Sequence, residues 1–274
     1  MSEKKRRFKI IYLRLITVIG ISLFFVLSFK ADIQVLEGSL SGSRMLGLHL
    51  TDPFIALEVF VTNHTLPVNL IIGTITILLF YFIFGGRIFC SWVCPYGLIS
   101  EFIDFIRHKL IMKHIIKHRE LNFNRYYFLI FWILLSVITG TLFFEMFNMV
   151  GIVSRLIIYG VSFASIFVLL MIILELFFGR FWCRGVCPVG TVYGLLSRIS
   201  LGHIKWIKDD CNHCNKCINA CYDKRILSEI INIRDNGTTK EYVIKNAGCN
   251  MCCKCLDSCT TSSFQYENKI KKII

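Results

Sequence analysis

The sequence predicts a mainly α-helical membrane protein with four transmembrane helices, followed by a small α+β domain at its C-terminal end. Three observations support this fold class: an apolar composition, four long apolar stretches and a polar tail rich in cysteine. Of the 274 residues, 55% are hydrophobic and only 18% are charged, which is too apolar for an ordinary water-soluble protein. The formal net charge of +13 is therefore expected on the segments outside the membrane.

Four apolar stretches are each near the ~20 residues that an α-helix needs to cross a bilayer. The first follows a basic segment and lacks a cleavage site of small residues, so we expect an uncleaved membrane helix and not a signal peptide. None of the four has a charge at its centre. The predicted spans cover about residues 10–29, 68–84, 126–144 and 156–178.

The basic residues of the connections predict the orientation, because basic loops stay on the cytoplasmic side of the membrane. Residues 30–67 hold only Lys30 and Arg44 as basic residues, whereas the connection between the second and third spans is rich in Lys and Arg. Both termini are therefore expected in the cytoplasm. Within the basic connection, the apolar spacing of residues 95–118 predicts an amphipathic helix on the inner leaflet.

The second and fourth spans run into similar turns, GRIFCSWVCPYG at 86–97 and GRFWCRGVCPVG at 179–190. This internal repeat predicts two parallel helix-pair repeats with the same inward orientation. Its cysteines are either small residues that pack a helix junction, or they have a redox or quinol-linked role. In the second case they form an S4 metal site, an additional iron–sulfur cluster or a dithiol pair that exchanges electrons. These cysteines are Cys90, Cys94, Cys183 and Cys187.

The tail contains two C-x2-C-x2-C-x3-C runs, a spacing typical of ferredoxins with two 4Fe–4S clusters, in which the fourth cysteine of each run binds the other cluster. We therefore predict a dicluster ferredoxin-type domain over 203–274, on the cytoplasmic side, after a membrane domain over 1–202. Zinc ribbons have a different spacing. Tyr222 and Thr260 replace the usual proline after each run, and Cys253 is a spare thiol. The expected ligands are Cys211, Cys214, Cys217 and Cys259 for the first cluster and Cys249, Cys252, Cys255 and Cys221 for the second.

Other cofactor motifs are absent from the sequence. All histidines lie outside the predicted spans, and there is neither a C-x-x-C-H haem site nor a G-x-G-x-x-G dinucleotide site. A lipid-soluble quinol is then the expected electron donor. Glu145 and Glu175, near the ends of spans three and four, are candidate residues for a quinol site. His49, Asp52 and His64 of the outer loop are weaker candidates.

With these motifs, the chain resembles the NapH family, the membrane ferredoxin-type subunits of periplasmic nitrate reductase systems. The resemblance implies a quinol dehydrogenase component of the bacterial inner membrane that draws on the quinone pool. It also implies a NapG-like periplasmic iron–sulfur partner that passes electrons toward the nitrate reductase, and no nucleic-acid partner. The NosR and CcoG polyferredoxins share the cysteine motifs. The residues that carry the resemblance are those of 50–53, 89–95, 140–142 with Glu145, 187–190 with 193–194, and the two cluster runs.

Two other functions compete with quinol oxidation. One is a metal reductase or assembly factor, in which the tail clusters reduce copper held by the four repeat cysteines, since thiolates favour Cu(I). The other is a membrane anchor or redox sensor whose clusters signal to a partner protein.

Overall fold

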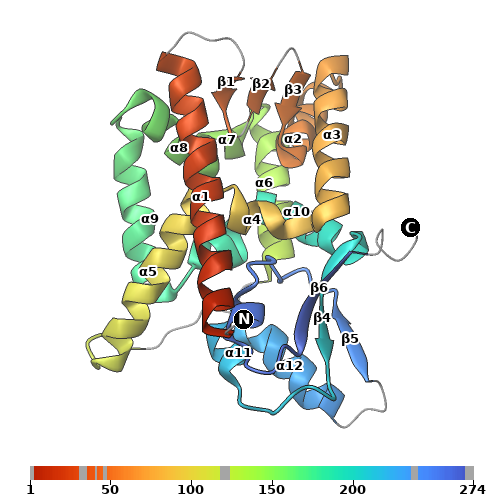
Figure 1. The fold of residues 1–274 in the computed structure, drawn as a ribbon. Helices are drawn as coiled ribbons and strands as arrows, with labels where there is room; N and C mark the ends of the chain where they lie inside the picture. Colours follow the sequence, from red (N-terminus) through yellow and green to blue (C-terminus); the bar gives the residue numbers. More distant parts are fainter. Residues whose placement is uncertain are drawn as a thin grey trace. The chain divides into compact units, whose positions relative to one another are not determined.

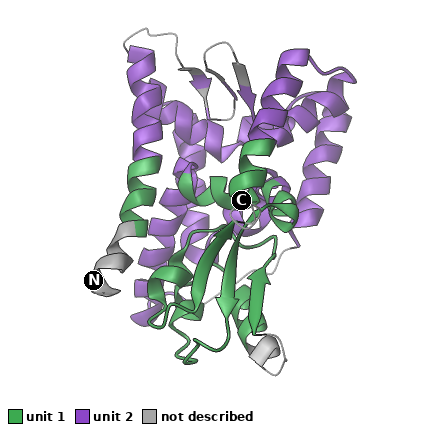
Figure 2. Ribbon diagram, turned by 45° about the vertical axis from the view of Figure 1, so that its right-hand side comes forward, with its two compact units in different colours: residues 1–17, 79–92, 193–274 green, residues 18–78, 93–192 purple. Residues whose placement is uncertain are grey.

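The computed structural model describes residues 3–30, 36–40, 42–45, 48–117, 124–235 and 240–268. The chain is mostly helical and divides into two compact units (Figure 2). Unit 1 comprises Met1–Thr17, Leu79–Trp92 and Tyr193–Ile274, and unit 2 comprises Val18–Leu78 and Val93–Val192. Each unit is therefore built from segments that are distant in the sequence.

Unit 1 contains a three-stranded antiparallel sheet in the order β5–β4–β6 (Figure 1). The central strand β4 (Gly202–Ile207) pairs with β5 (Glu241–Ile244) on one side and with β6 (Phe264–Asn268) on the other. Helix α12 (Lys224–Asp235) contributes apolar side chains to the same core. Burial of these side chains is the main stabilising term for so small a sheet. The core includes Ile204, Trp206, Leu227, Ile231, Ile244 and Phe264.

The rest of unit 1 includes Met1–Thr17, the first copy of the repeat and the chain before β4. Helix α3 (Val68–Phe84) ends at Gly85, and a 3-10 turn, η1 (Gly86–Ile88), and the short helix α4 (Phe89–Trp92) follow. Gly85 has φ 123°, and a Cβ there would lie 2.2 Å from Met251 Sδ. A larger residue there would displace the Met251 side chain, and the positive φ itself favours glycine.

Unit 2 consists of helices and one small sheet of three antiparallel strands. The helices begin at local sequence signals: Asn124 and Asn148 accept backbone N–H groups as N-caps, and Pro53 and Pro95 occupy first turns. The elements are β1 (Leu36–Ser39), β2 (Gly42–Met45), β3 (Leu48–Thr51), α2 (Pro53–Asn63), α5 (Pro95–Met112), α6 (Arg125–Thr139), α7 (Phe143–Phe147), α8 (Met149–Tyr159), α9 (Ala164–Phe178) and η2 (Trp182–Val186). Helix α10 (Pro188–Ile199) continues from η2 into unit 1.

The third and fourth predicted spans are each interrupted in the structure. Helix α6 ends at Thr139, because Gly140 takes a left-handed conformation with φ 63°, and the chain resumes as α7. The apolar stretch 156–178 begins inside α8, breaks after Tyr159 at Gly160 with φ 92°, and continues as α9. In both places a glycine with positive φ ends the helix.

Helix length limits which segments can cross a membrane unaided. Within the described residues, Ile10–Lys30 of α1 (Glu3–Lys30) is the one helix long and apolar enough to do so. Val68–Phe84 and Gly86–Trp92 qualify only as a pair, bent by 103°. Helices α2, α6, α8 and α9 are shorter apolar helices.

The predicted amphipathic helix after the first C-x3-C-P turn is α5, which ends at Met112 and not at residue 118. The two acidic residues of α5 form ion pairs with one arginine of the second repeat turn. Arg180 forms ion pairs with Glu101 at 3.5 Å and with Asp104 at 3.6 Å. These contacts connect α5 to the second copy of the repeat within unit 2.

Candidate iron–sulfur and redox sites

The two cysteine runs of the tail fold with the same local backbone. In each run the second and fourth residues after the first cysteine have positive φ, His213 and Asn215 in the first and Met251 and Cys253 in the second. A short helix follows, α11 (Lys216–Ala220) or α13 (Lys254–Ser258), and the fourth cysteine after it is extended. Left-handed residues in such loops form concave nests of backbone N–H groups, which suit the anionic sulfur of iron–sulfur sites.

One pocket of unit 1 is lined by four cysteines from both runs, the first three from the first run and the last from the second. Its other lining residues come from the same loops, from α12 and from the start of β6. The four cysteines are Cys211, Cys214, Cys217 and Cys259.

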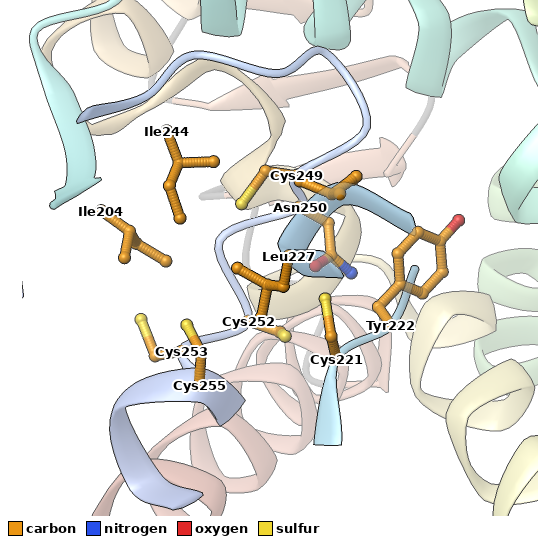
Figure 3. A pocket seen from close by; sticks show the side chains of 11 residues that line it. Ile204, Cys221, Tyr222, Leu227, Ile244, Cys249, Asn250, Cys252, Cys253 and Cys255 are labelled. Atoms are coloured by element: carbon orange, nitrogen blue, oxygen red, sulfur yellow. The ribbon is translucent and has the colours of Figure 1, made fainter. Parts of the chain in front are cut away.

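A second pocket is lined by the opposite combination of cysteines (Figure 3). Apolar residues of the core, Ile204, Leu227 and Ile244, form much of the remaining wall. The fourth cysteine of each run is thus found with the first three of the other run. The cysteines of this pocket are Cys221, Cys249, Cys252, Cys253 and Cys255.

The chemistry of these thiols fits iron–sulfur clusters. Burial raises the pKa of Cys217 to about 11, of Cys221 to about 12 and of Cys249 to about 11. Such thiols are protonated at neutral pH unless bound iron supplies the positive charge that favours thiolate. Among the described residues, no three His, Cys, Asp or Glu side chains converge closely enough to hold a single metal ion. Four sulfurs around a cavity suit a cofactor with several metal atoms.

The missing prolines do not prevent the turns after the fourth cysteines. Cys221 Sγ donates to the backbone carbonyl of Asp223 at 3.1 Å. Cys259 Sγ lies 3.6 Å from Thr261 Oγ1. Although burial acts to raise it, hydrogen bonds involving Thr261 and Ser263 lower the pKa of Cys259. Local hydrogen bonds therefore stabilise the turn after each fourth cysteine, where ferredoxins usually have a proline.

The two pockets differ in their exposure to solvent. Residues 212–216 of the first loop are all exposed, and Cys214 is the one exposed cysteine in the described part of the chain. Residues 249–255 of the second loop are buried or half-buried. The spare thiol Cys253 is half-buried, lines the second pocket and occupies the left-handed position that Asn215 has in the first run.

Three of the four repeat cysteines lie in unit 2 and Cys90 lies in unit 1. Cys94 is buried, caps the N-terminus of α5 and accepts the backbone N–H of Gly97 at 3.3 Å. Burial, together with the neighbouring Glu175, Cys94 and Cys187, raises the pKa of Cys183. The structure therefore brings Cys94, Cys183 and Cys187 into one electrostatically coupled group.

The Glu175 carboxyl belongs to this group. Glu175 is 1% exposed, and Ser100, Tyr96 and Arg180 are its polar and charged neighbours, although neither carboxyl oxygen has a hydrogen-bond partner among the described residues. Tyr96 and Ser100 are themselves 1% exposed. A carboxyl next to thiols, with two hydroxyl groups beside it, can accept or donate a proton when the charge on the sulfur changes.

Glu145, the other predicted carboxylate, is a surface ion-pair residue. It accepts hydrogen bonds from Asn148 at 3.0 Å and from Arg155. The buried carboxyl of this region is instead Glu58 of α2, which is 2% exposed and which the sequence analysis missed. The sequence signal that could have identified Glu58 is its position as a lone carboxylate in the apolar segment 53–63. Asp52, the N-cap of α2, is also buried, and burial raises its pKa to about 7.

Two buried arginines of unit 1 were missed as well. Arg14 is 3% exposed although it lies in the first predicted span, and Arg87 is 2% exposed. Both contact the first repeat turn or the tail through long-range hydrogen bonds.

Both copies of the internal repeat match a known protein-family model. A family model described as a 4Fe-4S binding domain matches residues 66–113 and 159–208. These two segments each contain one membrane-type helix and one C-x3-C-P turn. No solved structure matches the chain.

Curated relatives cover most of the chain. The methylamine utilization ferredoxin-type protein MauN of Methylobacillus flagellatus is 34% identical over 80% of this chain and 79% of the relative. The ferredoxin-type protein NapH of Haemophilus influenzae is 27% identical over 95% and 90%, and NapH of Escherichia coli is 28% identical over 85% and 80%. The chain therefore belongs to the NapH and MauN family of ferredoxin-type iron–sulfur electron-transport proteins.

Proposed function

We propose that this protein is a quinol dehydrogenase subunit that passes electrons from the membrane quinone pool to a NapG-like iron–sulfur partner and on toward a periplasmic nitrate reductase. The observation that carries the proposal is the sorting of eight cysteines into two pockets, with the fourth cysteine of each run exchanged. Oxidation of one quinol to quinone releases two electrons and two protons, and two bound 4Fe–4S clusters take up one electron each.

The proposal places the chain in the bacterial inner membrane, with four crossings and both termini in the cytoplasm. Large apolar side chains on the shorter helices support it, since they are exposed and suit contact with lipid tails. On α6 and α9, for example, the exposed fractions are 79% for Ile138 and 54% for Leu134, and 67% for Ile166. Breaks near Gly140 and Gly160 are compatible with crossing where neighbouring helices cover the freed backbone groups.

The chain also offers groups for the two protons. Glu58 and Glu175 are buried carboxyls in unit 2, and buried carboxyls in membrane domains are candidates for proton relays. Glu175 belongs to the same group as Cys183, so a proton can move there when the charge on sulfur changes. The family match to the repeat supports a redox role for the four repeat cysteines, as holders of a further cluster or metal or as a dithiol pair.

The test is anaerobic purification in detergent, with iron counting and EPR spectra before and after a menaquinol analogue is added. We expect about eight iron atoms per chain and reduction of both clusters by the quinol. Iron beyond that number would assign a cofactor to Cys90, Cys94, Cys183 and Cys187. Clusters that dithionite reduces but quinol leaves oxidised would contradict quinol oxidation.

The same preparation tests the metal-reductase alternative, in which thiolates of the repeat cysteines hold Cu(I). Copper bound in stoichiometric amount, and lost in Cys183→Ser, would support that function in place of quinol oxidation. The greater identity to MauN favours a second downstream acceptor, in methylamine utilisation. Deletion of the gene should then abolish growth on methylamine and leave nitrate respiration intact, whereas the primary proposal predicts the reverse.

A further inference from the structure

The first repeat turn is held against the loop that carries three cysteines of the second pocket. Both segments belong to unit 1. Three side chains of the turn donate to backbone carbonyls that surround Cys249. The bonds run from Arg87 to Ala247 at 3.4 Å and Gly248 at 3.0 Å, from Ser91 Oγ to Asn250 at 2.7 Å, and from Trp92 Nε1 to Met251 at 3.2 Å.

Arg87 contacts both parts of the chain that bring cysteines to this pocket. Its guanidinium binds the carbonyl of Gly248, the residue before Cys249, and lies over the ring of Tyr222, the residue after Cys221, at 5.8 Å. Because Arg87 is 2% exposed, water screens its charge little. Cys249 directly follows Gly248 in the chain, so this charge lies beside a cysteine of the second pocket.

A second buried arginine supports the same turn. Arg14 Nε donates to the Ser91 carbonyl at 3.1 Å, while the Ser91 hydroxyl binds the loop. The turn is thus held from two sides.

The corresponding arginine of the second repeat has different partners. Arg180 is ion-paired with Glu101 and Asp104 of α5, within unit 2. Two carboxylates lie 3.5 Å and 3.6 Å from its guanidinium, whereas the guanidinium of Arg87 donates to the Ala247 and Gly248 carbonyls beside Cys249. The repeat therefore provides two corresponding arginines: Arg87 contacts the loop of the second pocket, and Arg180 contacts two carboxylates of α5.

We propose that Arg87 is the positioning residue of the second cluster, which its buried charge holds at a higher reduction potential than that cluster would otherwise have. The inference rests on the proposed function for the existence of two tail clusters. A nearby positive charge stabilises the more negative, reduced form of a cluster and so raises its potential. The first repeat turn, with Cys90 inside it, is then the junction through which electrons enter the tail.

The experiment is an EPR-monitored redox titration of Arg87→Gln, with chemical reductants and mediators in place of quinol. We expect the potential of the second cluster to fall, while that of the first cluster stays at the wild-type value. Arg180→Gln is the control and should shift neither. Because no quinol is used, failure of quinol oxidation and failure of this inference give different results.

Arg87→Lys separates charge from structure. Lysine keeps the charge, so its second cluster should titrate close to the wild-type potential even if Arg87→Gln loses that cluster. Unchanged potentials in Arg87→Gln, equal shifts in Arg180→Gln, or loss of the cluster in both Arg87 variants would overturn the inference.

Discussion

The Glu58 carboxyl is buried in unit 2, and its two oxygens have different surroundings. Oε1 accepts hydrogen bonds from Ser136 Oγ at 2.5 Å and from the Phe144 backbone N–H at 2.9 Å. Oε2 has no hydrogen-bond partner among the described residues. Burial raises the pKa of Glu58, against the opposing effect of both hydrogen bonds. The side chain thus connects α2 with α6 and with the start of α7.

Replacement of Glu58 should separate its structural role from its charge. Glu58→Leu leaves the buried Phe144 N–H without its acceptor, while the Ser136 hydroxyl keeps the Trp132 carbonyl, so we expect a loss of about 1–3 kcal/mol in stability. Glu58→Gln keeps an acceptor oxygen and should retain the wild-type melting temperature. Thermal unfolding in detergent measures both. Equal stability of Glu58→Leu and the wild type would show that these hydrogen bonds contribute nothing.

The quinol assay then uses Glu58→Gln, because that variant is expected to stay folded. A slower quinol oxidation in this variant, with intact clusters, would support proton uptake by Glu58. An unchanged rate would remove Glu58 from the proton route and leave Glu175 as the candidate.

Contacts of this kind could not be predicted from the sequence. Glu58 and Ser136 are 78 positions apart, and Arg87 and Ala247 are 160 positions apart. Composition and residue spacing describe local patterns. The partners in these long-range hydrogen bonds depend instead on how the whole unit packs. The cysteine runs are the opposite case, since a fixed local spacing specifies the loop, and a prediction of both runs needed no tertiary contact.

Among the elements, the two cluster loops are near copies in backbone and differ at one instructive position. Asn215 and Cys253 both cap the helix that follows, with φ 56° and φ 58°. Asparagine tolerates the left-handed region better than most residues, and cysteine has no such preference. Cys253 nevertheless lines the second pocket, with its Sγ 3.4 Å from the Met251 carbonyl.

Two substitutions therefore distinguish the spare thiol from a predicted ligand. We expect Cys253→Asn, which copies the first loop, to keep the full iron content. Cys255→Ser should lose about four iron atoms per chain and the EPR signal of one cluster. Iron analysis and EPR of the anaerobically purified variants make the comparison. Loss of iron in Cys253→Asn would instead identify Cys253 as a ligand.

The glycines at the helix breaks, Gly140 and Gly160, are visible in the sequence. The prediction of continuous spans nevertheless followed the length of the apolar stretches. Each glycine lies inside or beside a long apolar stretch, and hydropathy does not register backbone conformation. Positive φ at these positions became evident only in the folded chain. The cap residues Asn124 and Asn148, by contrast, are recognisable sequence signals.

For the molecule as a whole, the unequal exposure of the two cluster loops matters most. In the proposed two-cluster arrangement, the exposed loop 212–216 gives a soluble redox partner access to the first cluster, whereas residues 249–255 are buried or half-buried. Because electron transfer is favoured over short distances, the soluble partner then exchanges electrons with the first cluster, and the second cluster lies farther from that partner along the path.

This difference predicts the order in which iron is removed. With ferricyanide and an iron chelator, we expect about half of the tail iron to leave in a fast phase, accompanied by loss of the first cluster's EPR signal. The second cluster should follow more slowly. Stopped-flow absorbance and freeze-quenched EPR samples measure the two phases. A single phase for both clusters would contradict a functional difference in exposure.

The divergent partners of Arg87 and Arg180 have a consequence for the duplication itself. Two equivalent halves would offer an electron two routes of equal driving force, and hence no preferred one. Here the guanidinium of Arg180 is ion-paired with two carboxylates, whereas that of Arg87 donates to backbone carbonyls beside Cys249, so the two halves have different electrostatic surroundings. In the proposed electron route, this difference between two corresponding side chains makes one half the preferred path.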